Sequence, residues 1–383
     1  MPDRVYLDWN ATTPLRPEAR AAMAAGWDIS GNPSSVHAEG RQARRLLEDA
    51  RAAVASAVGG RPQDVVFTSG GTEANALALT PGVRRGAGQP ARRLLVSAIE
   101  HPSVLSGGRF APEAIGMVEV TGSGLVDVDC LRRLLADGPP ALVSVMLANN
   151  ETGAIQPISE VADVVHEAGG LLHVDAIQAL GKISFDIKSM KADLITLSAH
   201  KIGGPKGVGA LVLGEEVQVE ALLRGGGQEL GRRAGTENVT GIAAFGAATA
   251  AAMAALAPDA QRLQSLRERL EKGLMQTPGM IVFSAGAPRL PNTTLFTVPG
   301  LKAETAVIGF DLGGIAVSSG SACSSGKVQP SHVLAAMGVP KDLAQGAVRL
   351  SLGWSTSEAD IDLALQAWRK LADALLRGRR NTA

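Results

Sequence analysis

Short runs of apolar residues alternate along most of the chain with longer segments in which apolar residues recur every three to four positions. The short runs have the length of strands, and the longer segments have the period of amphipathic helices. Strands are expected at 65–68, 94–97, 142–146, 171–174, 194–197 and 208–213, and helices at 41–58, 129–136 and 158–168. This alternation predicts βαβ units around a mainly parallel sheet. The strand runs are nearly continuous in Val, Leu and Ile, which indicates that helices cover both faces.

The pattern changes near residue 258. A long charged helix is expected at 261–275, strand-like runs at 281–283 and 293–298, and a closing helix at 358–376. We therefore expect a domain boundary near residue 258. The uncharged segment 241–258 consists mostly of alanine with Gly and Thr, so its hydrophobicity is too weak for a bilayer and a buried helix is expected.

Composition excludes several classes of partner. The 383 residues contain 37 Lys and Arg and 37 Asp and Glu, so the formal net charge is zero. Nucleic acids and anionic membranes both favour basic surfaces, so neither is expected as a partner. Two cysteines form no disulfide framework, and the first residues lack the pattern of a secretion signal. A cytoplasmic location is therefore expected.

Lys201 is the most informative residue. It follows the expected strand at 194–197 and comes just before Gly203 and Gly204, so its amine is carried to the rim of a core. Burial lowers the pKa of a lysine and makes the amine a nucleophile for carbonyl groups. One interpretation is a Schiff-base lysine for a pyridoxal cofactor. The other is a lysine that caps a strand end and reaches solvent.

A second motif joins the strand at 65–68 to Gly70, Gly71 and a helix expected to start at Thr72. Free N–H groups and the helix dipole make such an N-terminus a phosphate site. The motif matches neither a P-loop nor the dinucleotide fingerprint, which counts against ATP and NAD. The alternative is an ordinary strand–turn–helix with Thr72 as the N-cap.

Two further strand ends carry candidate residues. Asp175 ends the strand at 171–174, where an acid points into the ligand crevice of an open α/β sheet and could pair with a pyridinium nitrogen. Gln178 lies one helical turn later, within reach of the phenolic oxygen of the ring. His101 follows another strand and could stack on a cofactor or move protons. A helix N-cap for Asp175 and a structural role for His101 are the alternatives. No histidine pair has metal-ligand spacing, so no metal site is expected.

Cys323 lies in a stretch of small residues, with five serines and two glycines from Ser318 to Gly326. A free cysteine is usually buried. A thiol on a polar loop is therefore a candidate nucleophile, and an incidental exposed cysteine is the alternative. Cys130, at the start of an expected helix, is interpreted as structural.

With these residues placed, the chain resembles the cysteine desulfurases of the class V aminotransferase group over nearly its whole length. The shared motifs are Tyr6-Leu-Asp-Trp-Asn-Ala-Thr-Thr-Pro14, Gly31-Asn-Pro-Ser-Ser-Val-His37, Thr68-Ser-Gly-Gly-Thr-Glu73, Ser97-Ala-Ile-Glu-His-Pro102, Ala148-Asn-Asn-Glu-Thr-Gly153, His173-Val-Asp-Ala-Ile-Gln178, Ser198-Ala-His-Lys201, Arg232-Arg-Ala-Gly-Thr-Glu237 and Ser319-Gly-Ser-Ala-Cys323. The surroundings of Cys323 are similar to those of the long-loop group, the nitrogenase and iron–sulfur type.

The resemblance implies the fold of the pyridoxal-phosphate-dependent transferases, fold type I, similar to aspartate aminotransferase. A large cofactor-binding domain is expected at 15–258. A smaller α/β domain is expected from 1–14 and 259–383, with the cysteine loop at about 318–330. Homodimers are the rule in the family, and their sites lie at the subunit interface.

The resemblance also implies a role for each matching residue. Lys201 would bind pyridoxal 5'-phosphate covalently, Asp175 would pair with the ring nitrogen, His101 would stack on the ring and Gln178 would bind its phenolic oxygen. The phosphate would be held by Gly71, Thr72, Ser198 and His200, with Thr236 from the neighbouring subunit. The cysteine substrate would be held by Asn32, Asn150 and Arg349, and Asn150 would also contact the cofactor.

The implied activity is the conversion of L-cysteine to L-alanine. Lys201 would remove the Cα proton, and the Cys323 thiolate would take the sulfur as a persulfide. The sulfur would pass to an iron–sulfur scaffold protein or another sulfur carrier. The alternative is a selenocysteine lyase or an enzyme that uses both amino acids. An activity indifferent to Cys323→Ser would favour the lyase.

Overall fold

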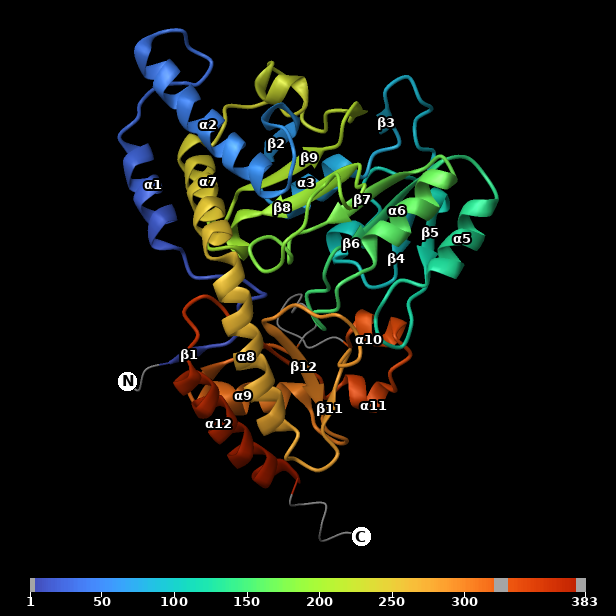
Figure 1. The fold of residues 1–383 in the computed structure, drawn as a ribbon, viewed down its shortest axis with the longest axis vertical. Helices are drawn as coiled ribbons and strands as arrows, with labels where there is room; N and C mark the ends of the chain where they lie inside the picture. The colour runs from blue at the N-terminus through green and yellow to red at the C-terminus, as the bar shows by residue number, and fades with distance from the viewer. Residues whose placement is uncertain (1–3, 320–329, 377–383) are drawn as a thin grey trace.

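The computed structural model describes residues 4–319 and 330–376. Its largest element is a seven-stranded sheet in the upper part of Figure 1, in the order β2-β9-β8-β7-β6-β4-β5. Its strands are β2 (Val65–Thr68), β4 (Arg93–Ser97), β5 (Ile115–Val118), β6 (Ala141–Met146), β7 (Leu171–Asp175), β8 (Leu194–Ser198) and β9 (Gly209–Leu213). Strands β5, β4, β6, β7 and β8 are parallel, and β9 is antiparallel to both β8 and β2. The expected mainly parallel sheet is confirmed.

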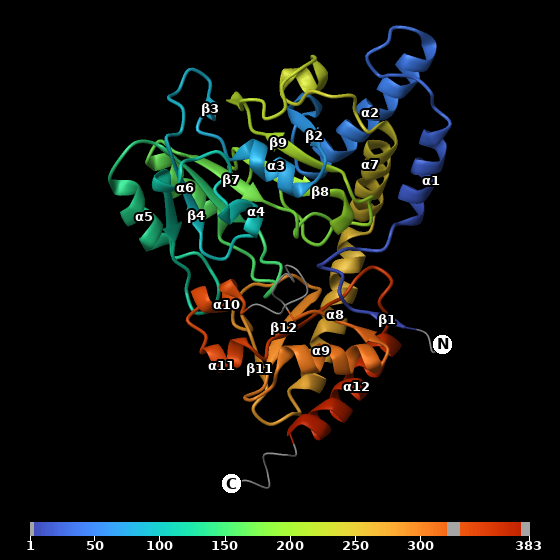
Figure 2. The same cartoon turned by 180° about the vertical axis from the view of Figure 1, so that it is seen from behind.

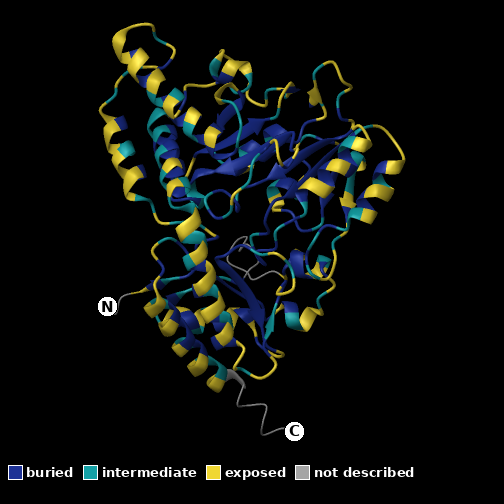
Figure 3. Cartoon of the chain, in the orientation of Figure 1, coloured by how far each residue is buried: buried dark blue, intermediate teal, exposed yellow. Residues whose placement is uncertain are grey.

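Both faces of this sheet are buried. Within β2, Val65 and Phe67 belong to one hydrophobic core and Val66 to another, and every other strand that contributes to both cores alternates in the same way. Because successive side chains point to opposite faces, a strand covered twice is mostly apolar along its whole length. The expectation of two covered faces is thereby confirmed, and Figure 3 shows the sheet as a buried layer.

The helices of this part form two layers. One core includes side chains from α2 (Ala38–Ala57), α5 (Val128–Ala136), α6 (Ile158–Glu167) and α7 (Val239–Ala254), with α1 (Pro17–Trp27) packed against α7. The other core includes α3 (Gly71–Ala78) and α4 (Pro102–Leu105). A two-stranded ribbon of β3 (Arg84–Arg85) and β10 (Val217–Gln218) lies beside them.

A second, smaller unit lies below the large sheet in Figures 1 and 2. Its antiparallel sheet has the order β11 (Ile281–Val282), β12 (Thr293–Thr297), β14 (Val348–Ser351). Strand β1 (Val5–Tyr6) pairs in parallel with β13 (Ile315–Ala316), which attaches the N-terminal segment to this unit. Its helices are α8 (Leu256–Leu274), α9 (Ala303–Leu312), α10 (His332–Ala336), α11 (Lys341–Ala344) and α12 (Glu358–Leu376).

The small unit has its own core. Trp368 is fully buried between Phe296, with ring centroids 5.1 Å apart, and Phe310, at 6.2 Å. This core is separate from those of the large sheet. The division into domains at residues 15–258 and 1–14 with 259–383 stays a prediction, which the separate cores and the pairing of β1 support.

Helices α7 and α8 run one after the other down the side of the molecule and connect the two units (Figure 1). Half of the residues of α7 are buried, in agreement with the buried helix expected at 241–258. Within residues 4–319 and 330–376, no single helix has both the length and the apolar character needed to cross a membrane. The pair α7 and α8 meets that test only together and is bent by 69°.

Candidate active site

A pocket of about 470 Å³ lies between the large sheet and the small unit. It is lined by residues that follow the carboxyl ends of β4, β6, β7 and β8, and by Arg349 on β14. The carboxyl ends of parallel strands meet at one edge of a sheet, which explains how distant motifs come together here. The predicted site residues that line it are Gly71, Thr72, His101, Asn150, Asp175, Gln178, Ser198, His200, Lys201 and Arg349.

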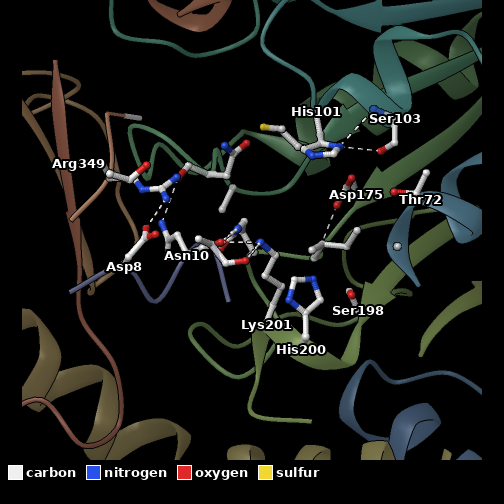
Figure 4. Close-up of a pocket in the computed structure, with 18 residues that line it drawn as sticks. Asp8, Asn10, Thr72, His101, Ser103, Asp175, Ser198, His200, Lys201 and Arg349 are labelled. Atoms are coloured by element: carbon white, nitrogen blue, oxygen red, sulfur yellow. Dashed lines mark hydrogen bonds and ion pairs between the residues drawn. The ribbon is translucent and has the colours of Figure 1, made fainter. Parts of the chain in front are cut away.

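Figure 4 shows Lys201 in the middle of this pocket, with Arg349 and Asp8 at one end and Thr72 and Ser198 at the other. The lysine ends a 3-10 turn (Ala199–Lys201) that directly follows β8. Its Nζ donates to the main-chain carbonyl oxygens of Asn10, at 2.6 Å, and Ala11, at 2.8 Å.

The surroundings make the Lys201 amine reactive. Burial, reinforced by the positive charge of Arg349, lowers its pKa from 10.5 to about 8. The side chain turns into the pocket, so the solvent-reaching strand cap does not describe it. A nucleophilic amine is the chemistry that this position supports.

Asp175 ends β7 and is buried. Its Oδ2 accepts from Nδ2 of Asn75 at 2.9 Å, and its Oδ1 accepts from the N–H of Ile177 at 3.0 Å. The second bond closes a turn after the strand, and no helix lies among the described residues 176–193 between β7 and β8, so the alternative of a helix N-cap is wrong; the carboxylate also lines the pocket. Burial raises the pKa of Asp175, so a cationic N–H partner in the pocket would stabilise its charged form.

The turn after β2 delivers the N-terminus of α3 to the same pocket. The N-cap is Gly70 and the helix begins at Gly71, so the expected start at Thr72 is one residue late. Gly209 on β9 lies against this turn, where an added Cβ would come within 2.5 Å of the carbonyl carbon of Gly70. A glycine is therefore required at 209 for the turn to reach its position.

His101 lines the pocket and caps α4. Its Nδ1 accepts from the N–H of Ser103 at 3.2 Å and lies 2.8 Å from Oγ of the same residue. Desolvation lowers the pKa of His101, so the neutral ring is favoured. With Nδ1 accepting, the ring proton is on Nε2.

Arg349 is buried on β14, and it makes an ion pair with Asp8, NH2 to Oδ1, at 2.7 Å. Its NH1 donates to the carbonyl oxygen of Asn150 at 2.9 Å, and its Nε is buried with no hydrogen-bond partner among residues 4–319 and 330–376. A guanidinium with an unsatisfied donor beside a cavity is suited to bind a carboxylate.

Two predicted site residues lie outside the pocket of their own chain. Asn32 is exposed in the loop between α1 and α2, where its Oδ1 accepts from the N–H of Ser34 at 2.9 Å. Thr236 is also exposed and lines a separate hollow of about 140 Å³ together with Glu229 and Arg233. Their assigned roles stay predictions.

Cys323 lies outside the described residues; Ser318, before it, lines the pocket, and both flanks are held by hydrogen bonds. Before it, Ser318 and Arg349 exchange main-chain hydrogen bonds of 2.7 and 3.1 Å. After it, Oγ of Ser331 donates to Oε2 of Glu151 at 2.5 Å, and Nε2 of His332 lies 2.9 Å from the carbonyl oxygen of Glu100. Cys130 is buried in a hydrophobic core, which agrees with its structural interpretation.

Four residues that hydrogen-bond at or next to the site had no predicted role: Asp8, Asn10, Asn75 and Lys182. Asp8 and Asn10 belong to the motif from Tyr6 to Pro14. This motif indicated the family resemblance but no function for either residue. Lys182 follows Gln178 by one helical turn, and Asn75 follows Thr72 by three residues. That spacing could have suggested a shared face.

Comparison with known proteins fits this site. The family model "Aminotransferase class-V" matches residues 5–364. A cysteine desulfurase from Cereibacter sphaeroides is 43% identical over 381 residues, which cover 97% of each chain. A NifS-like protein from Rickettsia africae superimposes with a TM-score of 0.88 at 37% identity, over 97% of this chain and 99% of that one.

A third similar protein is SspA, whose structure is described as a complex with cysteine. Its TM-score is 0.75 at 29% identity, and the match covers 91% of this chain and 98% of that chain. The matches therefore include both the large and the small unit of the fold. The chain belongs to the class-V aminotransferase family and, within it, to the cysteine desulfurases.

Proposed function

We propose that this protein is a pyridoxal-phosphate-dependent cysteine desulfurase that transfers the sulfur of L-cysteine to Cys323. The observation that carries the proposal is one pocket that holds a reactive lysine between a buried carboxylate, Asp175, and a buried guanidinium, Arg349. The family supports the activity, and the SspA structure in complex with cysteine supports the substrate.

The residues fit pyridoxal phosphate. Asp175 uses two of its roughly four acceptor sites and has room for a ring N–H. Lys201 would supply the amine that binds the aldehyde carbon, and Gln178 and His101 line the same pocket. The phosphate would be held by the N-terminus of α3 with Gly71, Thr72, Ser198 and His200. When bound, the cofactor supplies an electron sink that acidifies the substrate Cα–H.

Lys201 is the group that moves the substrate proton. A lowered pKa of about 8 leaves a usable fraction of neutral amine near neutral pH, so Nζ can accept the Cα proton and return it. Arg349 binds the substrate carboxylate through its guanidinium, and Asn150, which contacts Arg349 through its carbonyl, borders the same place.

Cys323 is the sulfur acceptor. Its thiolate attacks the substrate sulfur, the carbon–sulfur bond breaks, and Cβ of the former cysteine gains a proton to give alanine. A sulfur–sulfur bond forms on the enzyme, so one sulfur atom moves from carbon to thiol with no external oxidant or reductant. The flank at Ser318 supports this role because Ser318 lines the pocket and is bonded to the main chain of Arg349.

The proposed active form is a homodimer. Thr236 is exposed and does not line the pocket of its own chain, which supports a contribution to the neighbouring subunit's phosphate site. The sulfur then passes from Cys323 to an iron–sulfur scaffold protein or another sulfur carrier. Asn32, also exposed, is proposed as a further substrate contact.

The purified protein, loaded with pyridoxal phosphate, should be incubated with L-cysteine or L-selenocysteine and the alanine measured. The proposal expects alanine from cysteine that disappears in Lys201→Ala. A wild-type protein that binds no pyridoxal phosphate, or a Lys201→Ala variant that keeps full activity, would contradict it. Turnover of selenocysteine alone, unaffected by Cys323→Ser, would identify a selenocysteine lyase instead.

A further inference from the structure

A buried lysine stands behind the pocket, and the proposed chemistry does not use it. Lys182 is 8% exposed and does not line the pocket. Its Nζ donates to Oε1 of Gln178 at 2.6 Å and to Oδ1 of Asn10 at 3.2 Å. A buried amine is costly, so one that makes two hydrogen bonds to side chains in the interior needs a reason in the structure.

These hydrogen bonds form a closed ring of three residues. Nε2 of Gln178 donates to the main-chain carbonyl oxygen of Asn10 at 2.9 Å, and Lys182 joins the other ends of both residues. The carbonyl oxygen of Asn10 also accepts from Nζ of Lys201 at 2.6 Å. The ring therefore includes the main-chain carbonyl oxygen of Asn10, which is the atom that accepts from Lys201.

Lys182 and the carbonyl of Asn10 together hold the Gln178 amide in one orientation. A main-chain carbonyl only accepts, so the amide nitrogen faces Asn10, and the amide oxygen accepts from Nζ of Lys182 at 2.6 Å. The amide nitrogen then faces Asn10 and the pocket, with one N–H on the carbonyl of Asn10 and the other available to the pocket. Gln178 is thereby presented as a donor.

Lys182 also helps to fix Asn10, which is 1% exposed. Oδ1 of Asn10 accepts from Lys182 and from Nδ2 of Asn292, at 3.1 Å, and its Nδ2 donates to Oγ1 of Thr293 at 2.9 Å. Asn292 and Thr293 belong to the small unit and Lys182 to the large one. Asn10 is thus held from both sides.

We infer that Lys182 is a positioning residue that fixes the Gln178 amide as a donor and the Asn10 carbonyl as the acceptor for Lys201. This inference rests on the proposed cofactor site, because the free N–H of Gln178 would act on the phenolic oxygen of bound pyridoxal phosphate. A donor there stabilises the ionised oxygen, so the visible absorption band of the bound cofactor reports the position of Gln178.

The test is Lys182→Met, with Lys188→Met, an exposed lysine six residues later, as the matched control. The pH midpoint of the cofactor band and the affinity for pyridoxal phosphate are measured. The titratable and charged groups around Lys201 are Asp8, His101, Asp175, Lys182, His200 and Arg349. All except Lys182 are unchanged in the variant. We expect a shifted midpoint and roughly tenfold weaker binding in Lys182→Met, and no change in Lys188→Met.

A direct effect of the lysine charge is separated by repeating Lys182→Met in a Gln178→Ala background. A positioning role predicts that most of the midpoint shift disappears there. An equal shift in both backgrounds, or an unchanged midpoint in Lys182→Met, would overturn the inference. If Lys182→Met does not fold, Lys182→Gln, a shorter neutral donor, should give a smaller shift in the same direction, and a wild-type midpoint would overturn it. A wild-type protein that gains no visible band contradicts the proposed function instead.

Discussion

Nζ of Lys201 lies 2.6 Å from the carbonyl oxygen of Asn10, which joins the end of a central strand to the N-terminal segment. Asn10 is in turn bonded to Asn292 and Thr293 of the small unit. The reactive amine is therefore positioned by the contact between the two units, since the loop of Lys201 alone does not supply this acceptor. The following predictions test this arrangement and the roles assigned to its residues.

The first prediction concerns the pH at which Lys201 becomes nucleophilic. An ordinary lysine has a pKa of about 10.4, whereas burial and Arg349 lower the pKa of Lys201 to about 8. In cofactor-free protein, acylation of the Lys201 peptide should therefore be half-maximal near pH 8, measured by mass spectrometry. Arg349→Met should raise this midpoint and Asp8→Asn should lower it, because the two charges act in opposite directions. A wild-type midpoint near that of ordinary lysines would refute the assignment.

The second prediction concerns substrate binding by Arg349. Arg349→Lys keeps a positive charge but loses the planar fork that binds a carboxylate through two hydrogen bonds. The KM for L-cysteine should rise by roughly 10- to 100-fold, while the visible band of bound cofactor stays. An unchanged KM would mean that another group holds the carboxylate.

The third prediction concerns the buried ion pair of Arg51 and Glu229. Its two N–O distances are 2.7 and 2.9 Å, and Oε2 of Glu229 also accepts from the N–H of Phe67 at 2.9 Å. Glu229 has a positive φ of 48°, and the same segment leads to Thr236. The pair therefore holds the segment proposed to reach the neighbouring subunit.

Arg51→Met leaves the Glu229 carboxylate buried and alone, so it should lower the free energy of unfolding by about 3–5 kcal/mol. The double variant Arg51→Met with Glu229→Gln keeps an acceptor for Phe67 and removes the buried charge, and it should recover part of that loss. Denaturant unfolding of both variants checks this. A loss below about 1 kcal/mol in Arg51→Met would show that the pair contributes only as a surface pair does.

The fourth prediction concerns Glu100, which is fully buried next to His101. Its Oε1 accepts from the N–H of Met146 and from Oγ of Ser97, both at 2.6 Å, and desolvation raises its pKa from 4.5 to about 8. The folded state thus holds a proton that the unfolded state loses above pH 4.5. Stability contributed by this proton is complete below pH 4.5 and is lost as the pH rises towards 8.

Glu100→Gln mimics the protonated carboxyl and removes this dependence. The variant should gain stability relative to the wild type as pH rises from 5 to 8, with a slope of the difference approaching about 1.4 kcal/mol per pH unit. Unfolding midpoints at several pH values measure the difference. A difference that stays constant with pH would show that Glu100 is ionised in the folded protein.

Much of the fold follows from the sequence, because strands covered on both faces are mostly apolar. The strand expected at 65–68 is β2 to the residue, and the helix expected at 358–376 is α12. Alanine-rich α7 begins at Val239, two residues before the expected start. The apolar run 208–213 predicts a strand, which is β9. Its antiparallel direction depends on pairing with β8 and β2, which no local pattern encodes.

Some residues of the site could likewise be predicted from the sequence, and others could not. Asp175, His101, Ser198 and Lys201 follow strand ends, so the rule for parallel sheets predicts that they meet. Asn10 and Asp8 could not be placed by that rule, because they reach the pocket from a segment that pairs with the small unit. The role of Lys182 depends on side-chain hydrogen bonds in the interior, and a helical spacing from Gln178 only suggests it.

The central claim is that sulfur from L-cysteine is carried by Cys323, and the mass of the Cys323 peptide after reaction tests it most directly. Loaded enzyme incubated with L-cysteine should show one added sulfur atom on this peptide, removable by a thiol reductant, and none on the Cys130 peptide, whose cysteine is buried. Cys323→Ser should keep the cofactor band and lose the modification, whereas Cys130→Ala should keep both. Added sulfur that persists in Cys323→Ser, or an unmodified Cys323 peptide while alanine accumulates, would contradict the account.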